Sequence, residues 1–388
     1  MRRLLTASRL ITATIVAALV APEFGSAETT TAETEHGPIR VETLVTGLTQ
    51  PVALAFLPDG RMIIAERSTG RISLLEIGSR TWTALAGAPE MLTNAECEVP
   101  DGACGLQDLK LHPDFAGNGW VYVCYTEGPA HYSTLVVDRL RLDGTALVDR
   151  ERLFEADARA EDVYHLGGRM VFAQGHLFLT IGDRHHRDRA QDNTNHAGTI
   201  LRMTEDGGVP PDNPFVGEEG VLPEIYSFGH RNPQGLVYRP DAGELWSHEH
   251  GPAHGDELNR IVAGGNYGWP RVSFGWEYGG GAIGRGLWGE KGMERPIKVW
   301  VRAIAPSDLV YYDGAMFPAW RGSFLLGSMS RIHLNRLRIE NDQPVLEERI
   351  LQGTAGRVRA LAVDAAGAVY LGADTGHVLR LTPAEGWR

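Results

Sequence analysis

One pattern recurs six times along this chain: a short apolar run, a turn of Pro, Asp or Gly, and a second apolar run. The run alternates on both sides of each turn, which predicts six β-hairpins. Internal repeats of this length constrain a fold more than any other sequence feature. The copies lie about 50 to 70 residues apart and begin near Pro51 and at Leu109, Met170, Leu236, Leu309 and Leu361.

Six hairpin-bearing repeats predict an all-β, six-bladed β-propeller with long functional loops at one end of the channel. The remaining strands are expected in the intervals, for example at 71–77, 134–142 and 333–339. The segment 41–48 is predicted to complete the last blade beside 378–383, because closure of the ring removes exposed sheet edges. A pair of β-sandwiches is the structural alternative, but it would not need six copies of one hairpin.

The N-terminus has the three parts of a secretory signal peptide. Three arginines lie within the first nine residues, residues 10–21 are apolar or small, and Gly25, Ser26 and Ala27 offer a cleavage point. An apolar core of about 12 residues is too short for a bilayer, which needs about 20. An uncleaved anchor is the alternative interpretation.

The signal-peptide pattern and the hairpin repeats together predict how the chain is organised. We expect a signal peptide over 1–27, a loose polar leader over 28–37 and a single six-bladed propeller domain over 38–388. The mature protein is expected to be periplasmic or secreted. No later stretch is apolar enough to cross a membrane, so stable membrane insertion is not expected.

Charge excludes one class of function. The chain has 37 Lys and Arg against 49 Asp and Glu, a formal net charge of −12. An acidic chain lacks the basic surface of a general nucleic-acid binder, so no nucleic-acid partner is expected.

Cysteine usage fits an oxidising compartment. Cys97 and Cys104 are close enough in sequence to close a short loop as a disulfide. Cys124 lies in the apolar run VYVCY and is predicted to be a buried strand residue.

A histidine beside two glycines marks the entrance to the third hairpin, in the run YHLGGRM at 164–170. Glycine lets the backbone approach a ligand closely, and an imidazole acts as a general base near neutral pH. His165 is therefore a candidate base. The alternative is a histidine satisfied by loop hydrogen bonds.

Two arginine-bearing stretches flank other hairpins. Arg231 and Asn232 precede the fourth hairpin, and Arg357 and Arg359 open the sixth. Two residues that are two positions apart on a strand point to one face. Because guanidinium groups suit carboxylates, these residues predict an anionic ligand in the channel. The alternatives are a solvated loop and an exposed blade edge.

The segment 248–259, HEHGPAHGDELN, leaves the fourth hairpin with three histidines and three carboxylates. One interpretation is zinc on His248, His250 and His254. The other is a hard cation such as calcium, bound by backbone carbonyls at the Gly251–Pro252 turn and by carboxylates. The spacing does not decide between them.

Taken together, these stretches resemble the soluble PQQ-dependent aldose sugar dehydrogenases of the glucose/sorbosone dehydrogenase family, from about Val41 to Leu381. Members of that family are six-bladed propellers, which agrees with the repeat count. The resemblance rests on the order and spacing of HLGGR at 165–169, DNPF at 212–215, GHRNPQG at 229–235, EHGPAHGDE at 249–257 and GGNYGWP at 264–270.

The resemblance implies a cofactor and a reaction. Pyrroloquinoline quinone (PQQ), a planar o-quinone with three carboxylates, would lie in the channel mouth. His165 would be the general base while the C1 hydroxyl of an aldose is oxidised to a lactone by hydride transfer, and an external electron acceptor would follow. Arg231 and Asn232 would contact the quinone, and Arg357 and Arg359 would pair with its carboxylates.

The resemblance also implies two calcium ions. Gly251 and Pro252 would present main-chain oxygens to a calcium that bridges to the quinone. A second, structural calcium would lie at Glu257 and the carbonyl of Tyr267.

Two positions depart from the family pattern. Ala103 stands where a Gln usually contacts the cofactor, with Gln107 four residues on, and Ser330 stands where a Lys is often found. Each change removes one polar contact to the quinone. The glycine- and tryptophan-rich stretch 275–292 is expected to form part of the sugar-binding rim.

Two other functions fit the same propeller. A calcium-dependent hydrolase, such as a lactonase, would need Glu249, Asp256 and Glu257 as metal ligands at the channel centre. A non-catalytic secreted binding propeller would explain the loss of the Gln and Lys contacts.

Overall fold

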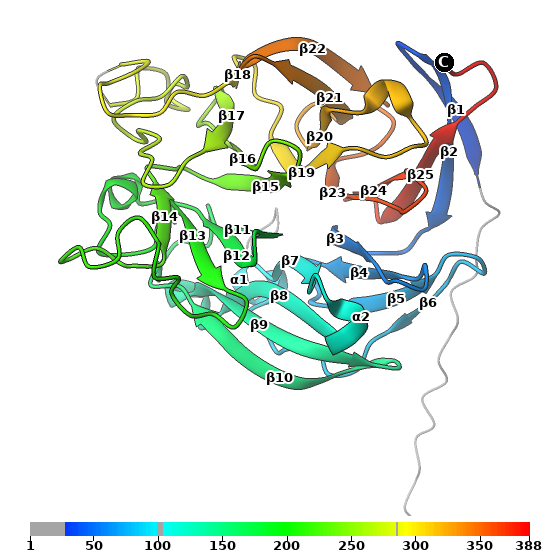
Figure 1. Ribbon diagram of the computed structural model, residues 1–388, viewed down its shortest axis with the longest axis horizontal. Helices are drawn as coiled ribbons and strands as arrows, with labels where there is room; N and C mark the ends of the chain where they lie inside the picture. Colours follow the sequence, from blue (N-terminus) through cyan, green and yellow to red (C-terminus); the bar gives the residue numbers. More distant parts are fainter. Residues whose placement is uncertain (1–27, 99–103, 285) are drawn as a thin grey trace, which may run out of the picture.

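The computed structural model describes residues 28–98, 104–284 and 286–388, so the predicted signal peptide over 1–27 lies outside them. The described residues form six antiparallel sheets around a central channel (Figure 1), which confirms the six-bladed propeller. Five of the sheets are meanders whose first strand in sequence lies innermost, and in the sixth sheet the innermost strand is Val358–Val363; the six inner strands lie next to one another around the channel.

The first three blades are built from these strands: β3 (Pro51–Phe56), β4 (Met62–Glu66), β5 (Ile72–Glu76) and β6 (Thr81–Ala84); β7 (Leu106–Leu111), β8 (Trp120–Glu127), β9 (Thr134–Asp143) and β10 (Ala146–Glu155); β11 (Gly167–Ala173), β12 (His176–Ile181), β13 (Thr199–Thr204) and β14 (Ile225–Phe228).

The last three blades are built from these strands: β15 (Pro233–Arg239), β16 (Glu244–Glu249), β17 (Asp256–Ile261) and β18 (Lys298–Trp300); β19 (Pro306–Tyr312), β20 (Ser323–Ser328), β21 (His333–Glu340) and β22 (Gln343–Ile350); β23 (Val358–Val363), β24 (Val369–Ala373) and β25 (His377–Pro383), with β2 (Gly37–Val45) and β1 (Thr29–Thr34).

Among the residues that the structure describes, helical structure is limited to short turns in the loops, which are α1 (Asn94–Cys97), α2 (Phe115–Asn118), η1 (Ala130–Tyr132), η2 (Arg187–Gln191) and η3 (Pro318–Trp320). No helix in the described ranges has the length and hydrophobicity needed to cross a membrane.

All six predicted hairpins are present, as the innermost pair of strands in each blade. The tightest is the β11–β12 turn, where Ala173 pairs with His176 and only Gln174 and Gly175 intervene. Both turn residues have positive φ, 52° and 74°. This is the backbone that two-residue hairpins need to match the twist of their strands.

The N-terminal strand closes the ring as predicted. β2 pairs antiparallel with β25, with Val41 opposite Leu381, so the first and last segments of the chain share blade 6. The expectation of a loose leader over 28–37 was wrong, because Thr29–Thr34 forms β1 on the open edge of β2. The threonine-rich sequence TTTAET suits an exposed edge strand, although it carries almost no apolar signal.

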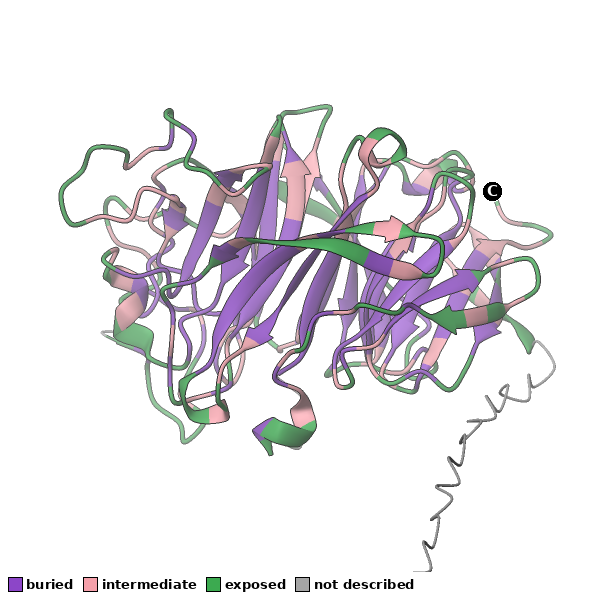
Figure 2. Cartoon of the chain, turned by 90° about the horizontal axis from the view of Figure 1, so that it is seen from below, coloured by how far each residue is buried: buried purple, intermediate pink, exposed green. Residues whose placement is uncertain are grey.

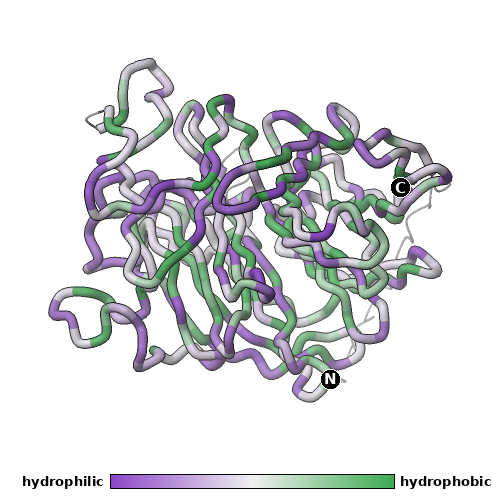
Figure 3. The backbone as a smooth tube through the Cα atoms, turned by 45° about the horizontal axis from the view of Figure 1, so that its top comes forward, coloured by the Kyte–Doolittle hydropathy of each residue, from purple (hydrophilic) through white to green (hydrophobic). Residues whose placement is uncertain are grey.

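The hydrophobic core lies between blades rather than within one sheet pair. In the described chain, six buried clusters each join two neighbouring blades. Central strands such as Met62–Glu66 are therefore buried on both faces, whereas outer strands are exposed (Figure 2). Figure 3 shows the hydrophobic positions running along the strands inside the blades.

One arginine ties the inner strands together. Arg169, in β11, is 2% exposed and lies 3.8 Å from the Asp108 carboxylate of blade 2. Its guanidinium donates hydrogen bonds of 2.8 to 3.0 Å to main-chain oxygens in the four other blades, those of Val52, Gln234, Ser307 and Arg359. A single side chain thus connects all six blades beneath the channel mouth.

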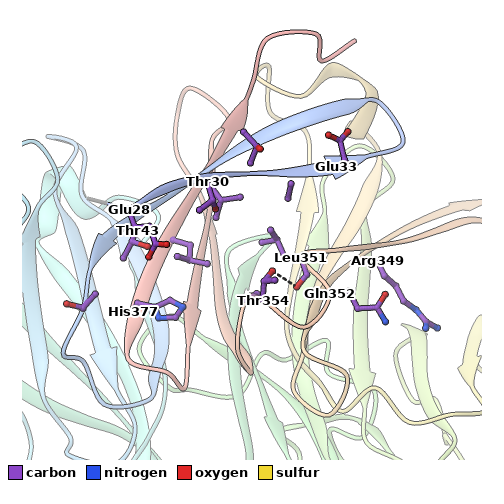
Figure 4. Close-up of a pocket in the computed structure, with 15 residues that line it drawn as sticks. Glu28, Thr30, Glu33, Thr43, Arg349, Leu351, Gln352, Thr354 and His377 are labelled. Atoms are coloured by element: carbon purple, nitrogen blue, oxygen red, sulfur yellow. Dashed lines mark hydrogen bonds between the residues drawn. The ribbon is translucent and has the colours of Figure 1, made fainter. Parts of the chain in front are cut away.

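A groove lies at the outer edge of the ring, between the β1–β2 pair and blade 5 (Figure 4). It has a volume of about 750 Å³, and its walls include Thr30, Glu33, Arg349 and His377. It contains none of the predicted site residues, so it does not correspond to the predicted cofactor site.

Candidate active site

The predicted residues meet in one pocket at the channel mouth. A cavity of about 380 Å³ is lined by the loops that precede the inner strands of blades 3, 4 and 6. The loop that follows β16 completes its wall. The predicted residues that line it are His165, Arg231, Asn232, Gly251, Pro252, Arg357 and Arg359. Residues separated by nearly 200 positions in sequence are therefore brought together by ring closure.

His165 is held as an oriented base. Its Nδ1 lies 2.6 Å from Oδ1 of Asp183, and its backbone adopts a left-handed φ of 49°. A non-glycine residue in this region is uncommon and persists where the surroundings fix it. Because Nδ1 is engaged by the carboxylate, Nε2 is the ring nitrogen available to take a proton.

The surroundings keep His165 neutral. Burial lowers the pKa of His165, the hydrogen bond with Asp183 opposes this effect, and the charges of Arg231 and His185 lower the pKa further. Burial alone would raise the pKa of Asp183, but hydrogen bonds from His165 and Trp269 hold it below its usual value. A neutral imidazole against an ionised carboxylate is the state that a general base requires.

Asp183 was missed by the sequence analysis. It follows β12 directly, its main-chain N–H donates to the carbonyl of Arg231 at 2.8 Å, and Trp269 Nε1 donates to its Oδ2 at 2.7 Å. The preceding Gly182 is required here, because a Cβ would lie 2.0 Å from the His165 carbonyl oxygen. A Gly-Asp pair at the end of a buried strand was the available sequence signal.

Arg231 is fixed from several sides. Its main-chain N–H donates to Glu249 at 2.6 Å, and its Nη1 donates to the carbonyls of His250 at 3.1 Å and Gly251 at 2.7 Å. Its guanidinium also lies over the Trp269 ring, 5.3 Å from the centroid. The Gly251 oxygen that the resemblance assigns to calcium therefore accepts a hydrogen bond from Arg231 here.

The arginines of blade 6 share one carboxylate. Arg359 forms an ion pair with Asp374, and Arg357 Nε lies 3.1 Å from the same side chain. Arg67, which sequence analysis missed, adds a buried guanidinium to the pocket. Burial and then the charges of Arg359 and Arg169 lower the pKa of Arg67. The cluster carries more positive charge than Asp374 neutralises, which favours an anionic ligand.

The departures from the family pattern lie near the same pocket. Gln107 and Ser330 both line it. Ser330 donates to the carbonyl of Ala303 at 3.1 Å. Ala103 lies outside the described residues. The Gln107 amide borders the pocket, and its Nε2 donates to the carbonyl of Gly105 at 3.2 Å.

Glu257 and Tyr267 line a second, much smaller cavity of about 10 Å³ that Arg231 and Gly251 also border. Burial and the neighbouring Glu249 raise the pKa of Glu257 well above its usual value. Asn259 donates to both carboxylates, at 3.2 and 3.4 Å, while its own Oδ1 is buried without a partner. Two buried carboxylates this close form a site that a cation would stabilise.

The zinc interpretation finds no support in the geometry. His248 Nε2 meets the carbonyl of Asp308 at 3.3 Å, and His250 Nε2 meets the carbonyl of Pro306 at 2.7 Å. Over residues 28–98, 104–284 and 286–388, no group of three or more His, Cys, Asp or Glu side chains is arranged to hold a metal ion.

The carboxylates that a hydrolase would need have other partners. Asp256 accepts main-chain N–H groups from Gly251, Ile304 and Ala305 at 2.8 to 2.9 Å. Glu249 is bound by His230 at 3.1 Å in addition to Arg231. These contacts fix loops and leave the two carboxylates poorly placed to activate a metal-bound water at the channel centre.

Exposed aromatic residues surround the mouth. Tyr164 and Tyr278 line the pocket and are 43% and 77% exposed. The loop that carries Tyr278 is tied across the mouth by an ion pair between Glu277 and Arg187 at 2.6 Å. The expected rim segment 275–292 thus reaches the pocket through Tyr278.

Comparisons with known proteins agree with this geometry. The model of the family "Glucose / Sorbosone dehydrogenase" matches residues 48–380. An aldose sugar dehydrogenase of Escherichia coli (strain K12) is 32% identical over 354 residues, covering 89% of this chain and 93% of that protein.

Two solved structures extend the likeness. The aldose sugar dehydrogenase of Escherichia coli in its apo-form has a TM-score of 0.83 at 32% identity, covering 89% of this chain and 100% of that one. The PQQ-bound form of aldose sugar dehydrogenase from Streptomyces coelicolor has a TM-score of 0.72 at 27% identity, covering 93% and 99%.

Proposed function

Because the chain belongs to the glucose/sorbosone dehydrogenase family, we propose that it is a quinoprotein that oxidises the C1 hydroxyl of aldose sugars to lactones, with PQQ and calcium as cofactors. The relatives support a PQQ-type sugar dehydrogenase. The observation that carries the finer proposal is the His165–Asp183 pair, which shares one pocket with the guanidiniums of Arg231 and Arg359.

The pocket fits a small polyanion. Its volume of about 380 Å³ lies within the range of small-molecule sites. Arg67, Arg231, Arg357 and Arg359 offset the three carboxylates of PQQ, and Asn232 adds a polar contact to the quinone. Gln234 Nε2 donates to Asn232 Oδ1 at 2.9 Å, which orients the Asn232 amide so that its NH₂ is left for the ligand.

The chain's own residues perform the proton chemistry. Nε2 of His165 accepts the proton of the substrate C1 hydroxyl, and Asp183 stabilises the imidazolium that results. When bound, PQQ supplies the electrophilic carbon that accepts hydride, and calcium polarises it. Tyr278 and Tyr164 flank the opening where the sugar enters. An external electron acceptor would reoxidise the site for the next cycle.

Calcium binding is proposed at two places. The main-chain oxygens of Gly251 and Pro252 would hold the bridging ion, which would have to share or displace the hydrogen bond from Arg231 to Gly251. The buried carboxylate of Glu257 and the carbonyl of Tyr267 would hold the structural ion.

Export of the protein is also proposed. Residues 1–27 have the signal-peptide pattern, and Cys97 and Cys104 form a disulfide in the structure. Disulfides persist in oxidising compartments such as the periplasm and the extracellular space.

Reconstitution tests the proposal. The purified protein is loaded with PQQ and calcium, PQQ binding is followed by absorbance, and aldoses are screened with an artificial dye as electron acceptor. Dye reduction that depends on sugar, PQQ and calcium is expected. Lactone cleavage without bound PQQ would instead indicate a hydrolase. The absence of any turnover, whether or not PQQ binds, would indicate a binding propeller.

A further inference from the structure

A second imidazole stands beside the catalytic base. The ring centroid of His185 lies 4.9 Å from that of His165, with an interplanar angle of 69°. Nδ1 of His185 lies 2.6 Å from Oδ2 of Asp162. Two imidazole–carboxylate pairs, His165–Asp183 and His185–Asp162, are therefore in contact at the mouth of the pocket.

The two pairs are built alike and are linked through the backbone. His185, like His165, has a left-handed backbone, with φ of 62° against 49°. The main-chain N–H of His185 donates to Asp183 at 2.8 Å. Oδ1 of Asp162 accepts the main-chain N–H of Tyr164 at 2.8 Å. Each aspartate thus contacts both its own histidine and the loop that carries the other.

Exposure distinguishes the pairs. The side chains of His165 and Asp183 are 13% and 1% exposed, whereas that of His185 is 53% exposed. Each turnover leaves a proton on His165, which must be lost before the next substrate is oxidised. With 1% of its side chain exposed, Asp183 offers the proton no direct path to solvent, and product occupies the pocket beside Nε2 of His165 after each oxidation. The adjacent exposed imidazole offers a route to bulk solvent.

We propose that His185, oriented by Asp162, is a proton relay that takes the proton from His165 and releases it to solvent. This inference rests on the proposed function. In each cycle the substrate O–H and C1–H bonds would break as the C1=O bond forms, with the proton bound at Nε2 of His165 and the hydride accepted by the quinone. The N–H bond of the His165 imidazolium then breaks, the proton binds Nε2 of His185, directly or across a water molecule, and a buffer base removes it.

The electrostatics of the contact agree with this direction. The groups that face His185 are the carboxylate of Asp162, the His165 ring, and the Tyr164 ring at 5.9 Å. Burial and, after it, the charge of Arg231 lower the pKa of His165. A base that holds its proton weakly passes the proton on readily.

Buffer dependence and chemical rescue test the relay. Holoenzymes of wild type, His185→Gln and Asp162→Asn are assayed at saturating sugar and dye while buffer concentration is varied. The matched control is His186→Gln, the exposed neighbour on the same loop. At low buffer we expect kcat of His185→Gln to fall about tenfold, less than the 10²–10⁴-fold effect of a general base, with a smaller fall for Asp162→Asn. Added imidazole should restore the kcat of His185→Gln.

The outcomes separate this inference from the proposed function. Wild-type holoenzyme without sugar-dependent dye reduction would remove the proposed function and the relay together. An active wild type with an equally active, buffer-independent His185→Gln variant would overturn the relay alone. The relay would also be overturned if the lost kcat of His185→Gln were not restored by imidazole and came with weaker PQQ binding or an altered KM. That result would indicate a structural role for His185.

Discussion

Nδ1 of His165 and Oδ1 of Asp183 lie 2.6 Å apart, and the main-chain N–H of the same aspartate donates to the carbonyl of Arg231. One loop residue therefore sets both the tautomer of the proposed base and the position of a proposed cofactor ligand. Precise placement of reacting groups accounts for a large share of enzymatic rate enhancement. Two predictions come from this relationship.

His165→Ala should abolish proton abstraction without emptying the pocket. We expect turnover to fall by about 10²–10⁴-fold, the usual contribution of a general base, while PQQ still binds through the guanidiniums. Dye-linked kinetics measure the first effect and absorbance titration the second. Unchanged turnover would remove His165 from the mechanism.

The acid limb of the pH–rate profile should report His165. Its pKa is lowered chiefly by burial, and the hydrogen bond with Asp183 opposes that effect. Only the neutral imidazole accepts a proton, so a lowered pKa keeps the base active at pH 7, and kcat/KM should fall only below about pH 6.5. Asp183→Asn weakens the opposing interaction, so its limb should move to still lower pH and its plateau should drop by roughly 10²-fold. The assignment would be contradicted by an acid limb that is centred above pH 6.5 and keeps the same midpoint in Asp183→Asn.

Arg67 should contribute to cofactor affinity although no motif marks it. Arg67→Gln removes a buried charge from the pocket wall, and a hydrogen bond or ion pair to a charged group is worth about 1.5–3 kcal/mol, or roughly ten- to a hundredfold in affinity. Fluorescence or absorbance titration with PQQ measures it. The matched control is Arg338→Gln, an exposed arginine paired only with Glu340 in the described contacts, which should bind PQQ normally. Equal affinity in both variants would exclude Arg67 from the site.

The fold was predictable because each blade repeats the same local signal. Alternating apolar residues and turn residues specify a hairpin wherever they occur, and six copies leave few architectures. The closing strand 41–48 was predictable because closure of the ring removes an exposed sheet edge. β1 was not, because the polar run from Thr29 to Thr34 forms a strand only where β2 leaves an open edge.

The site residues that lie in sequence motifs were predictable. Those that reach the site only because the ring closes were not. His165, Arg231 and Arg359 lie in dense motifs and meet in the pocket as expected. Arg67 has no motif around it, and Asp183 is marked only by the Gly-Asp pair that follows a buried strand. Their partners come from other blades or from the far side of a loop, so only the folded ring shows the contacts.

Arg169 should be essential to stability rather than to chemistry. Its guanidinium satisfies main-chain oxygens in four other blades and lies beside Asp108. Arg169→Met would remove the donor to these four main-chain oxygens and the buried guanidinium beside Asp108, and breaking a buried pair in this way costs about 3–5 kcal/mol. Denaturant unfolding measures the loss, with Arg338→Met as the exposed control expected to change stability by less than about 0.5 kcal/mol. Equal stability of the two variants would contradict a connecting role.

Calcium should stabilise the fold through Glu257. Burial and, after it, the charge of Glu249 raise the pKa of Glu257, so it is costly to hold both carboxylates ionised without a cation. A ligand that binds only the folded state stabilises it by about 2.7 kcal/mol at a hundred times its dissociation constant, so calcium should raise the Tm of the wild type and a chelator should reverse the rise. Glu257→Gln removes both the repulsion and the anionic ligand, so its Tm without calcium should equal or exceed that of the calcium-free wild type and should respond less to added calcium. Calorimetry with and without calcium, at fixed ionic strength and with magnesium as the comparison ion, checks both parts. An equal calcium response in wild type and variant would place the stabilising ion elsewhere.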